Sequence, residues 1–89
     1  AGAKHAKRAL AQSMARELGP QGIHVAHFII DGAIDTPFIK ENFPDTYALK
    51  EKDGILQPKE IAEAYWNIHV QHPSAWTQEM DLRPYMEKF

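Results

Sequence analysis

The most apolar part of the chain lies in residues 23–36, where the run IHVAHFII is followed at once by the turn DGAIDT. Most residues of the run are β-branched or aromatic, which favours a β-strand. Polar and apolar positions do not alternate regularly, a pattern typical of a parallel strand that is covered on both faces. The turn would therefore lie at the carboxyl end of a parallel strand, where open α/β sheets bind their ligands.

The residues before this run have the pattern of an amphipathic helix. Residues 1–18 are rich in good helix formers, and no proline interrupts them. Apolar side chains recur every four positions and form a stripe along one face of the helix, at Ala6, Leu10, Met14 and Leu18. Gly19 and Pro20 predict the end of the helix, with Gly19 in the left-handed capping position.

After the turn, residues 37–56 form an excursion of mixed character. Aromatic and aliphatic residues alternate there with charges, and Pro44 and Gly54 interrupt any long element. The pattern predicts one or two short helices. Because functional loops commonly follow strand ends, we interpret the excursion as a mobile substrate flap, with an ordinary packed insertion as the alternative.

The last third of the chain predicts a helix followed by a strand. Residues 58–71 begin with Pro58, which suits a first helical position, and end before Pro73. Residues 77–82 alternate as a strand at or near a sheet edge, and residues 85–89 form a tail. The order strand, helix, strand predicts a βαβ unit with parallel strands.

Composition narrows the class of protein. The chain has 89 residues, a net charge of -2, and no cysteine. This length allows one small domain, the charge argues against nucleic acid as a partner, and the lack of cysteine is compatible with a cytoplasmic location. No apolar stretch approaches the roughly 20 residues that a transmembrane helix needs, so no membrane partner is expected.

Taken together, these segments resemble the C-terminal part of a short-chain dehydrogenase/reductase. The family's motifs are matched in order by Lys4, by Ala15-Arg16-Glu17-Leu18, by Gly22-Ile23-His24-Val25 and by Gly32-Ala33-Ile34-Asp35-Thr36. The resemblance implies an α/β fold, with residues 1–89 as a single fragment of a doubly wound, Rossmann-like parallel sheet. The family's tyrosine would stand immediately before Ala1, and its catalytic serine and glycine-rich loop further upstream. Asp31 replaces the usual proline, and one additional residue separates Gly22 from Gly32.

The resemblance implies roles for four residues. Lys4 would hold the nicotinamide ribose and lower the pKa of the tyrosine; otherwise it is a solvated lysine at a helix start. Gly32 would allow a cofactor to approach the backbone, or it is simply a turn glycine. Ile34 would offer backbone groups to the carboxamide of the cofactor. Thr36 would contact the cofactor and can also cap the following helix, since Pro37 comes next.

Other candidate groups carry weaker implications. The excursion would line the substrate side through Phe38, Ile39 and Phe43, because it directly follows the cofactor turn. The roles of Asp31 and Asp35 stay open, since a carboxylate beside a dinucleotide is unfavourable unless it points away or binds the turn. The five histidines do not predict a metal site, because no cysteine or suitably spaced carboxylate completes a ligand set. Trp66 and Trp76 are predicted to lie in a core or an interface.

The leading hypothesis for function is an oxidoreductase that uses NAD or NADP and transfers hydride between nicotinamide and a small carbonyl or alcohol substrate. The 89 residues alone would be inactive, because the tyrosine and most of the nucleotide site lie outside them. The alternative is a non-catalytic α/β module for assembly or binding. The family implies a homo-oligomer, dimer or tetramer, and the apolar strand with few covering elements independently predicts association.

Overall fold

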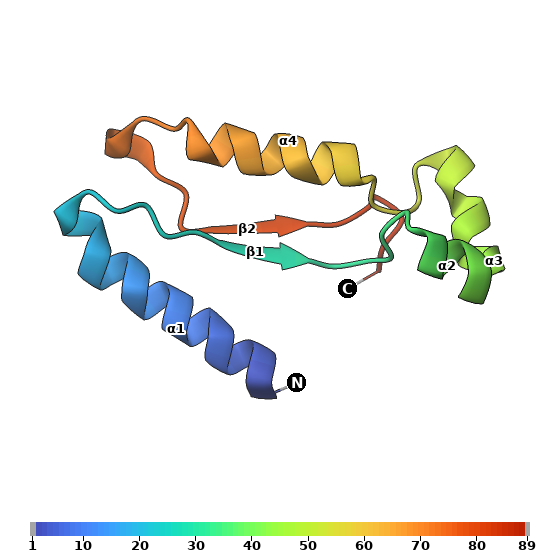
Figure 1. The fold of residues 1–89 in the computed structure, drawn as a ribbon, viewed down its shortest axis with the longest axis horizontal. Coiled ribbons are helices and arrows are strands. Elements are labelled where there is room, and N and C mark those ends of the chain that lie inside the picture. The colour runs from blue at the N-terminus through green and yellow to red at the C-terminus, as the bar shows by residue number, and fades with distance from the viewer. Residues whose placement is uncertain (1, 89) are drawn as a thin grey trace.

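The computed structural model describes residues 2–88, in the order helix, strand, short helices, helix, strand (Figure 1). The long helices are α1 (Gly2–Leu18) and α4 (Pro58–His69), and the strands are β1 (His27–Ile30) and β2 (Glu79–Leu82). Shorter helices are α2 (Pro37–Asn42), α3 (Pro44–Tyr47) and the 3-10 helices η1 (Gly19–Gln21), η2 (Ala48–Lys52) and η3 (Pro73–Ala75). Ala1 and Phe89, assigned from sequence to the first helix and the tail, lie outside the described residues.

The two strands pair in parallel, which confirms the predicted βαβ unit. His27 lies opposite Glu79 and Ile30 lies opposite Leu82. At either end of the ladder, the His27 N–H donates to the carbonyl of Gln78, just before β2, at 2.8 Å, and the Asp31 N–H donates to the Leu82 carbonyl at 2.9 Å. In Figure 1 the sheet lies between α4 and α1, and the short helices α2 and α3 gather beyond the carboxyl ends of both strands.

Helix α4 forms the better packed layer of the fold. Phe28 of β1 stacks on Tyr65 with ring centroids 3.7 Å apart and an interplanar angle of 7°. Ile68, one turn further along the helix, is 4% exposed, and Ile55 at the end of the excursion is also 4% exposed. These two isoleucines mark the small core of the described chain. The large apolar residues that remain exposed must therefore meet other surfaces or solvent.

The strands are shorter than the sequence predicts. β1 begins at His27 rather than at Ile23, and β2 begins at Glu79 rather than at Thr77. The segments before them are joined by side chains: the His24 ring lies 2.8 Å from the Thr77 carbonyl oxygen through Nε2 and stacks on Trp76. These side-chain contacts hold the two segments side by side without a backbone ladder between them. The regular strands therefore start later.

Two helix ends also differ from the prediction. The left-handed residue after α1 is Gly22, with φ 83°, rather than Gly19. Gly19, Pro20 and Gln21 continue as a 3-10 turn, because the fixed φ of proline is compatible with a helical turn. At the other end of the chain, α4 ends at His69 rather than at residue 71, and Val70 caps it.

Candidate functional site

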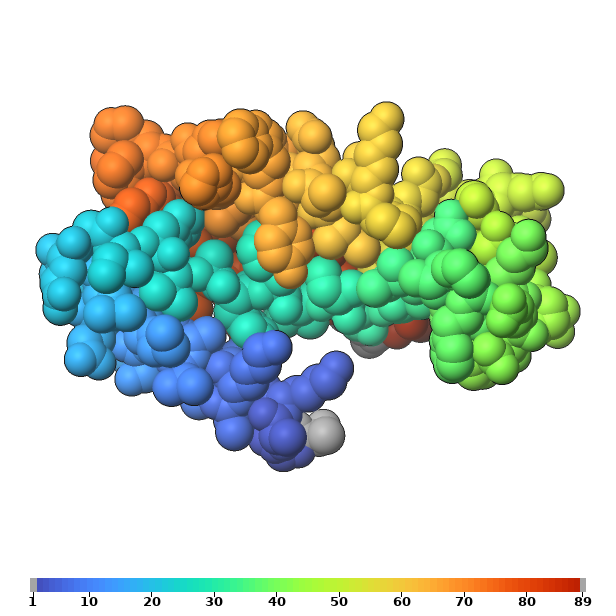
Figure 2. Space-filling model, in the orientation of Figure 1, coloured from blue at the N-terminus to red at the C-terminus, as the bar shows by residue number. Residues whose placement is uncertain are grey.

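The predicted catalytic residue Lys4 lies on the N-terminal half of α1, beside the carboxyl half of β1. It lines a groove of about 500 Å³. The other lining residues are His5, Lys7, Arg8, His27, Phe28, Ile29, Ile30 and Tyr65. Figure 2 shows this cleft between the N-terminal part of α1, in blue, and the blue-green strand. The groove thus combines an apolar floor from the sheet with a cationic wall from the helix.

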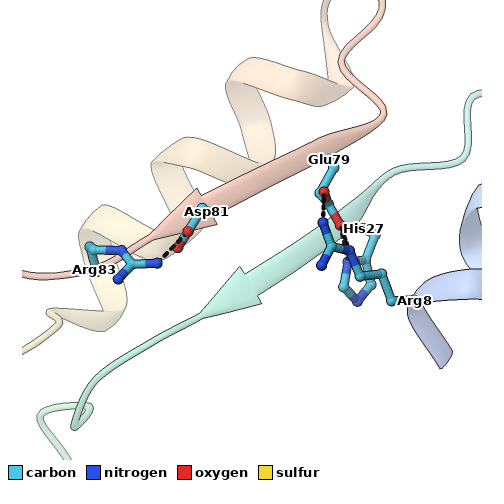
Figure 3. Close-up of polar contacts among 5 residues, drawn as sticks. All are labelled: Arg8, His27, Glu79, Asp81 and Arg83. Atoms are coloured by element: carbon cyan, nitrogen blue, oxygen red, sulfur yellow. Dashed lines mark hydrogen bonds and ion pairs between the residues drawn. The ribbon is translucent and has the colours of Figure 1, made fainter. Parts of the chain in front are cut away.

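An ion pair fastens this part of α1 to the sheet. Nε of Arg8 lies 2.6 Å from Oε1 of Glu79, and Nη2 donates to Oε2 at 2.8 Å (Figure 3). Nδ1 of His27 lies 3.3 Å from the same carboxylate. The hydrogen bond from Arg8 lowers the pKa of Glu79 below its usual range, and His27 adds to the effect. Because Lys4 lies one helical turn before Arg8, the two residues share the face of α1 that the pair holds against the sheet.

The turn after β1 contains Gly32, which has a positive φ of 139°. A Cβ built on this glycine would lie 2.8 Å from Cδ of Pro84, a distance that real side chains do not reach. Pro84 therefore packs against the face of Gly32 where a side chain would stand, and the approach of a cofactor to Gly32 stays a prediction. Packing against Pro84 and the backbone conformation together account for a glycine here.

The same turn is hydrogen-bonded to the end of the excursion, which the sequence does not reveal. The N–H of Leu56 donates to the Ala33 carbonyl at 2.8 Å, and the N–H of Asp35 donates to the Leu56 carbonyl at 2.8 Å. Ile34 is the bridge partner of Leu56, so its neighbours supply the hydrogen bonds. Because N–H and C=O groups alternate sides along an extended chain, those of Ile34 are directed away from Leu56. This orientation agrees with the role that the resemblance assigns to the Ile34 backbone.

The two aspartates with open roles form ion pairs. Oδ2 of Asp31 lies 3.0 Å from Nη1 of Arg83, and Oδ2 of Asp35 lies 2.9 Å from Nζ of Lys50. The hydrogen bond to Asp35 raises the pKa of Lys50. Each carboxylate therefore has a cation beside it, and Arg83 is shared with Asp81, so the ion pairs weaken the repulsion that an anionic cofactor would meet at the turn.

Thr36 caps α2, as its position before Pro37 predicts. Its Oγ1 accepts a hydrogen bond from the N–H of Ile39 at 3.3 Å. Thr36 also lines a hollow of about 310 Å³ with Lys40 and Tyr47. This hollow and the groove at Lys4 have no lining residue in common. The structure thus brings Gly32, Ile34 and Thr36 together in one turn, while Lys4 stands apart on α1.

The three predicted substrate residues lie on and beside α2. Phe38 is 62% exposed and Phe43 is 51% exposed, and their ring centroids are 6.1 Å apart. Ile39 between them is half-buried. An exposed pair of aromatic rings at the carboxyl edge of the sheet could contact a ligand above the turn, whereas its mobility stays a prediction.

The histidines and tryptophans take part in separate local contacts. His24 stacks on Trp76, and His72 caps η3 by accepting from the Ser74 N–H at 3.1 Å. Trp66 is 59% exposed on α4, so it does not belong to the core of the described chain. Among residues 2–88, no three histidine, aspartate or glutamate side chains are arranged to hold a metal ion. Nor does this part of the chain contain a helix long and apolar enough to cross a membrane.

Comparison with solved structures decides the family. The crystal structure of a short-chain dehydrogenase from Rhodopseudomonas palustris matches this chain with 44% sequence identity and a TM-score of 0.61, over 94% of this chain. The chain belongs to the short-chain dehydrogenase/reductase family. It spans 28% of the length of that solved chain. No family model and no curated protein matches it.

As part of a short-chain dehydrogenase/reductase, the chain has the fold that its motifs predict. The helix that carries Lys4, the apolar strand and the glycine-containing turn follow one another as in the C-terminal portion of this family, and the sheet is parallel. The departures at Asp31 and between Gly22 and Gly32 are accommodated locally. Asp31 binds Arg83, and the segment between Gly22 and β1 has no regular secondary structure.

Proposed function

We propose that the protein to which this chain belongs is an NAD(P)-dependent oxidoreductase that transfers hydride between nicotinamide and a carbonyl or alcohol carbon of a small molecule. The observation that carries the proposal is the match to a short-chain dehydrogenase at 44% identity over 94% of the chain.

Lys4 is the proposed catalytic residue of this chain. Its ammonium group stands in a groove with the cations of Lys7 and Arg8 on one wall. A positive field of this kind favours the ionised form of a nearby phenol, so it would lower the pKa of a catalytic tyrosine toward neutral pH. The same ammonium can donate hydrogen bonds to ribose hydroxyl groups.

The turn at residues 32–36 would hold the nicotinamide end of the cofactor, NAD or NADP. The Ile34 backbone groups are directed away from the Leu56 bridge, and Thr36 lines the adjacent hollow. Compensation of Asp31 and Asp35 by cations leaves the turn acceptable to an anionic dinucleotide. When bound, the nicotinamide would supply or accept the hydride, and the residues of this chain would orient it.

The excursion at residues 37–56 would cover the substrate. Phe38, Ile39 and Phe43 offer an apolar surface beside the cofactor turn. Such a surface suits the uncharged part of a small carbonyl compound or alcohol, because exposed aromatic rings gain most from excluding water. We therefore propose a small carbonyl compound or alcohol with an apolar part as the substrate.

Self-association in the cytoplasm completes the proposal. Leu10 is 60% exposed on α1, and Trp66 and Val70 are 59% and 55% exposed on α4. Two helices that both expose large apolar residues favour burial against further copies of the protein, as a dimer or tetramer. The absence of cysteine from the 89 residues is compatible with a reducing compartment.

The direct test measures oxidation of NADH and NADPH by the whole protein in the presence of a panel of aldehydes and ketones. We expect carbonyl-dependent loss of reduced nicotinamide absorbance with at least one cofactor. Lys59→Ala, an exposed charge removal on α4, should leave the rate unchanged and serves as the control. A protein that is folded by circular dichroism yet neither binds nor oxidises either cofactor would refute the proposal.

A further inference from the structure

The five residues after β2, numbers 83–87, form a C-terminal segment that touches two distant parts of the chain. It leaves the sheet at the carboxyl ends of both strands, where the turn and the excursion also begin (Figure 1). Pro84 is buried, whereas Arg83 before it is half-buried and Tyr85 and Met86 after it are exposed. Burial at a single point near a chain end indicates that the segment is anchored there.

The first anchor is to the turn that follows β1. Nη1 of Arg83 lies 3.0 Å from Oδ2 of Asp31, and the guanidinium group also binds the carboxylate of Asp81 (Figure 3). Pro84 fills the position where a side chain on Gly32 would stand, since its Cδ lies 2.8 Å from an ideal Cβ there. The turn is therefore held by the Arg83–Asp31 ion pair and by the ring of Pro84, which packs on Gly32.

The second anchor is to the exit of the excursion. Tyr85 donates a hydrogen bond from its hydroxyl group to the Lys52 carbonyl at 3.0 Å. Sδ of Met86 lies 2.9 Å from the position of a Cβ on Gly54, so methionine packs directly on this glycine. Lys52 and Gly54 lie immediately before Ile55 and Leu56, and Leu56 is hydrogen-bonded to the turn.

We propose that the C-terminal segment is a positioning element: it holds the turn at residues 32–36 and the exit of the excursion in one fixed arrangement. Arg83 and Pro84 act on the turn, while Tyr85 and Met86 act on residues 52–54. The hydrogen bonds between Leu56 and the turn join the two anchors into a closed ring of contacts. Movement of the excursion is then confined to residues 37–51.

The proposal bears on the cofactor through Ile34, and in this respect it rests on the proposed function. Ile34 lies between Ala33 and Asp35, whose backbone groups bind Leu56. If the C-terminal segment loosens, Leu56 is free to shift, and the Ile34 backbone loses its fixed direction. Cofactor affinity would fall without any change in a residue that touches the cofactor, which defines a positioning role.

Amide hydrogen exchange of the full-length protein without cofactor is the primary test. In Tyr85→Phe, which removes one hydroxyl group from an exposed side chain, we expect about three- to tenfold faster exchange at Gly54 and Leu56. Pro84→Ala should accelerate Asp35 and Leu56 by a similar factor. The matched controls are Tyr65→Phe on α4 and Pro73→Ala in η3, which lie outside the ring of contacts and should leave these amides unchanged.

Conservative replacement provides a second criterion. Arg83→Gln should accelerate the Asp31 amide, which donates to Leu82, whereas Arg83→Lys should restore most of its protection. Unchanged exchange at Gly54, Asp35 and Leu56 in both Tyr85→Phe and Pro84→Ala would overturn the proposal. Uniform acceleration that includes the α4 amides would overturn it as well, because the segment would then support the whole fold.

Titration of the same variants with NADH and NADPH separates this proposal from the proposed function. If exchange accelerates locally and cofactor dissociation constants rise about threefold or more, both ideas stand. If exchange accelerates locally but neither the parent nor the variants bind cofactor, the positioning element stands and the function fails. If exchange is unaltered and cofactor binding is normal, the proposed function stands and the positioning element fails.

Discussion

Asp35 donates its backbone N–H to the carbonyl oxygen of Leu56 at 2.8 Å, so a residue two positions before the excursion is hydrogen-bonded to the residue that ends it. The excursion is therefore a closed loop with a fixed base. α2, α3 and η2 project from that base, and their side chains are mostly exposed. The loop is also tied to the rest of the chain by the Lys50–Asp35 ion pair and by the hydrogen bond from Tyr85 to the Lys52 carbonyl.

Lys4→Ala in the whole protein should lower kcat by about two orders of magnitude or more, because the variant lacks the cation that we propose activates the proton-transfer group. Circular dichroism should remain unchanged, since Lys4 is exposed on α1. Steady-state kinetics with Lys59→Ala as the control make the comparison. Normal turnover in Lys4→Ala would remove Lys4 from the catalytic site.

Phe38→Ala and Phe43→Ala should each reduce kcat/KM about tenfold, because each removes an apolar contact from the substrate side of the turn. Amides of residues 37–51 should also exchange faster than those of α4 in the absence of substrate. Glu51→Ala is the control, since it shortens an exposed side chain in the same excursion. Unchanged KM and kcat in both alanine variants would show that the excursion does not contact substrate.

The Arg8–Glu79 pair should make stability depend on pH in a defined direction. Its hydrogen bond lowers the pKa of Glu79 in the folded state. The ionised carboxylate therefore stabilises the fold above the unfolded value of about 4.3, and this contribution disappears as pH falls through the lower folded value. Denaturation midpoints of Glu79→Gln should be lower than those of the parent at neutral pH and should converge with them in acid.

Glu63→Gln on α4 is the control for that experiment, because the change in charge is the same on an exposed helix surface. It should leave the difference between neutral and acidic midpoints close to that of the parent. A Glu79→Gln variant with the same pH profile as the parent would mean that the ion pair contributes nothing to folding.

Gly32→Ala should destabilise the fold by about 1–3 kcal/mol, because alanine is strained at a φ of 139° and its Cβ would overlap Pro84. Gly19→Ala is the matched control. No atom lies within 4 Å of a Cβ at Gly19, so that change should be neutral or stabilising by about 0.5 kcal/mol. Denaturant unfolding measures both variants, and equal stabilities would contradict the steric argument.

The isolated 89-residue chain should self-associate, because Leu10, Met14, Trp66 and Val70 leave apolar surface exposed. Sedimentation measures its mass directly. Leu10→Glu should shift the distribution toward smaller species, whereas Gln12→Glu on the same helix should not. A folded, soluble monomer at high micromolar concentration would contradict this prediction.

The sequence predicts the features whose causes are local. Pro58 begins α4 where expected, Thr36 caps α2, and the composition of residues 2–18 is sufficient to identify α1. The parallel pairing of the strands also follows from local patterns, because a helix between two strands leaves few alternatives. The family resemblance adds candidate site residues that no local pattern could have supplied.

The features that the sequence does not predict depend on partners far along the chain. Pro84 explains Gly32, Leu56 fixes the turn, and Arg83 and Lys50 neutralise the two aspartates. Nothing near Asp31 in the sequence indicates which cation it binds. Strand starts fail for the same reason, because β1 becomes regular only where β2 offers backbone partners.

The parallel pairing of β1 with β2 has a consequence for how the chain folds. His27 and Glu79 lie 52 residues apart, and no hairpin turn brings them together. Closing so long a loop loses chain entropy before the ladder forms, so the sheet assembles late. At ribosomal rates of roughly 5–20 residues per second, β1 leaves the exit tunnel several seconds before β2. During that interval β1 lacks its β2 partner, and an open strand edge of this kind is prone to aggregate.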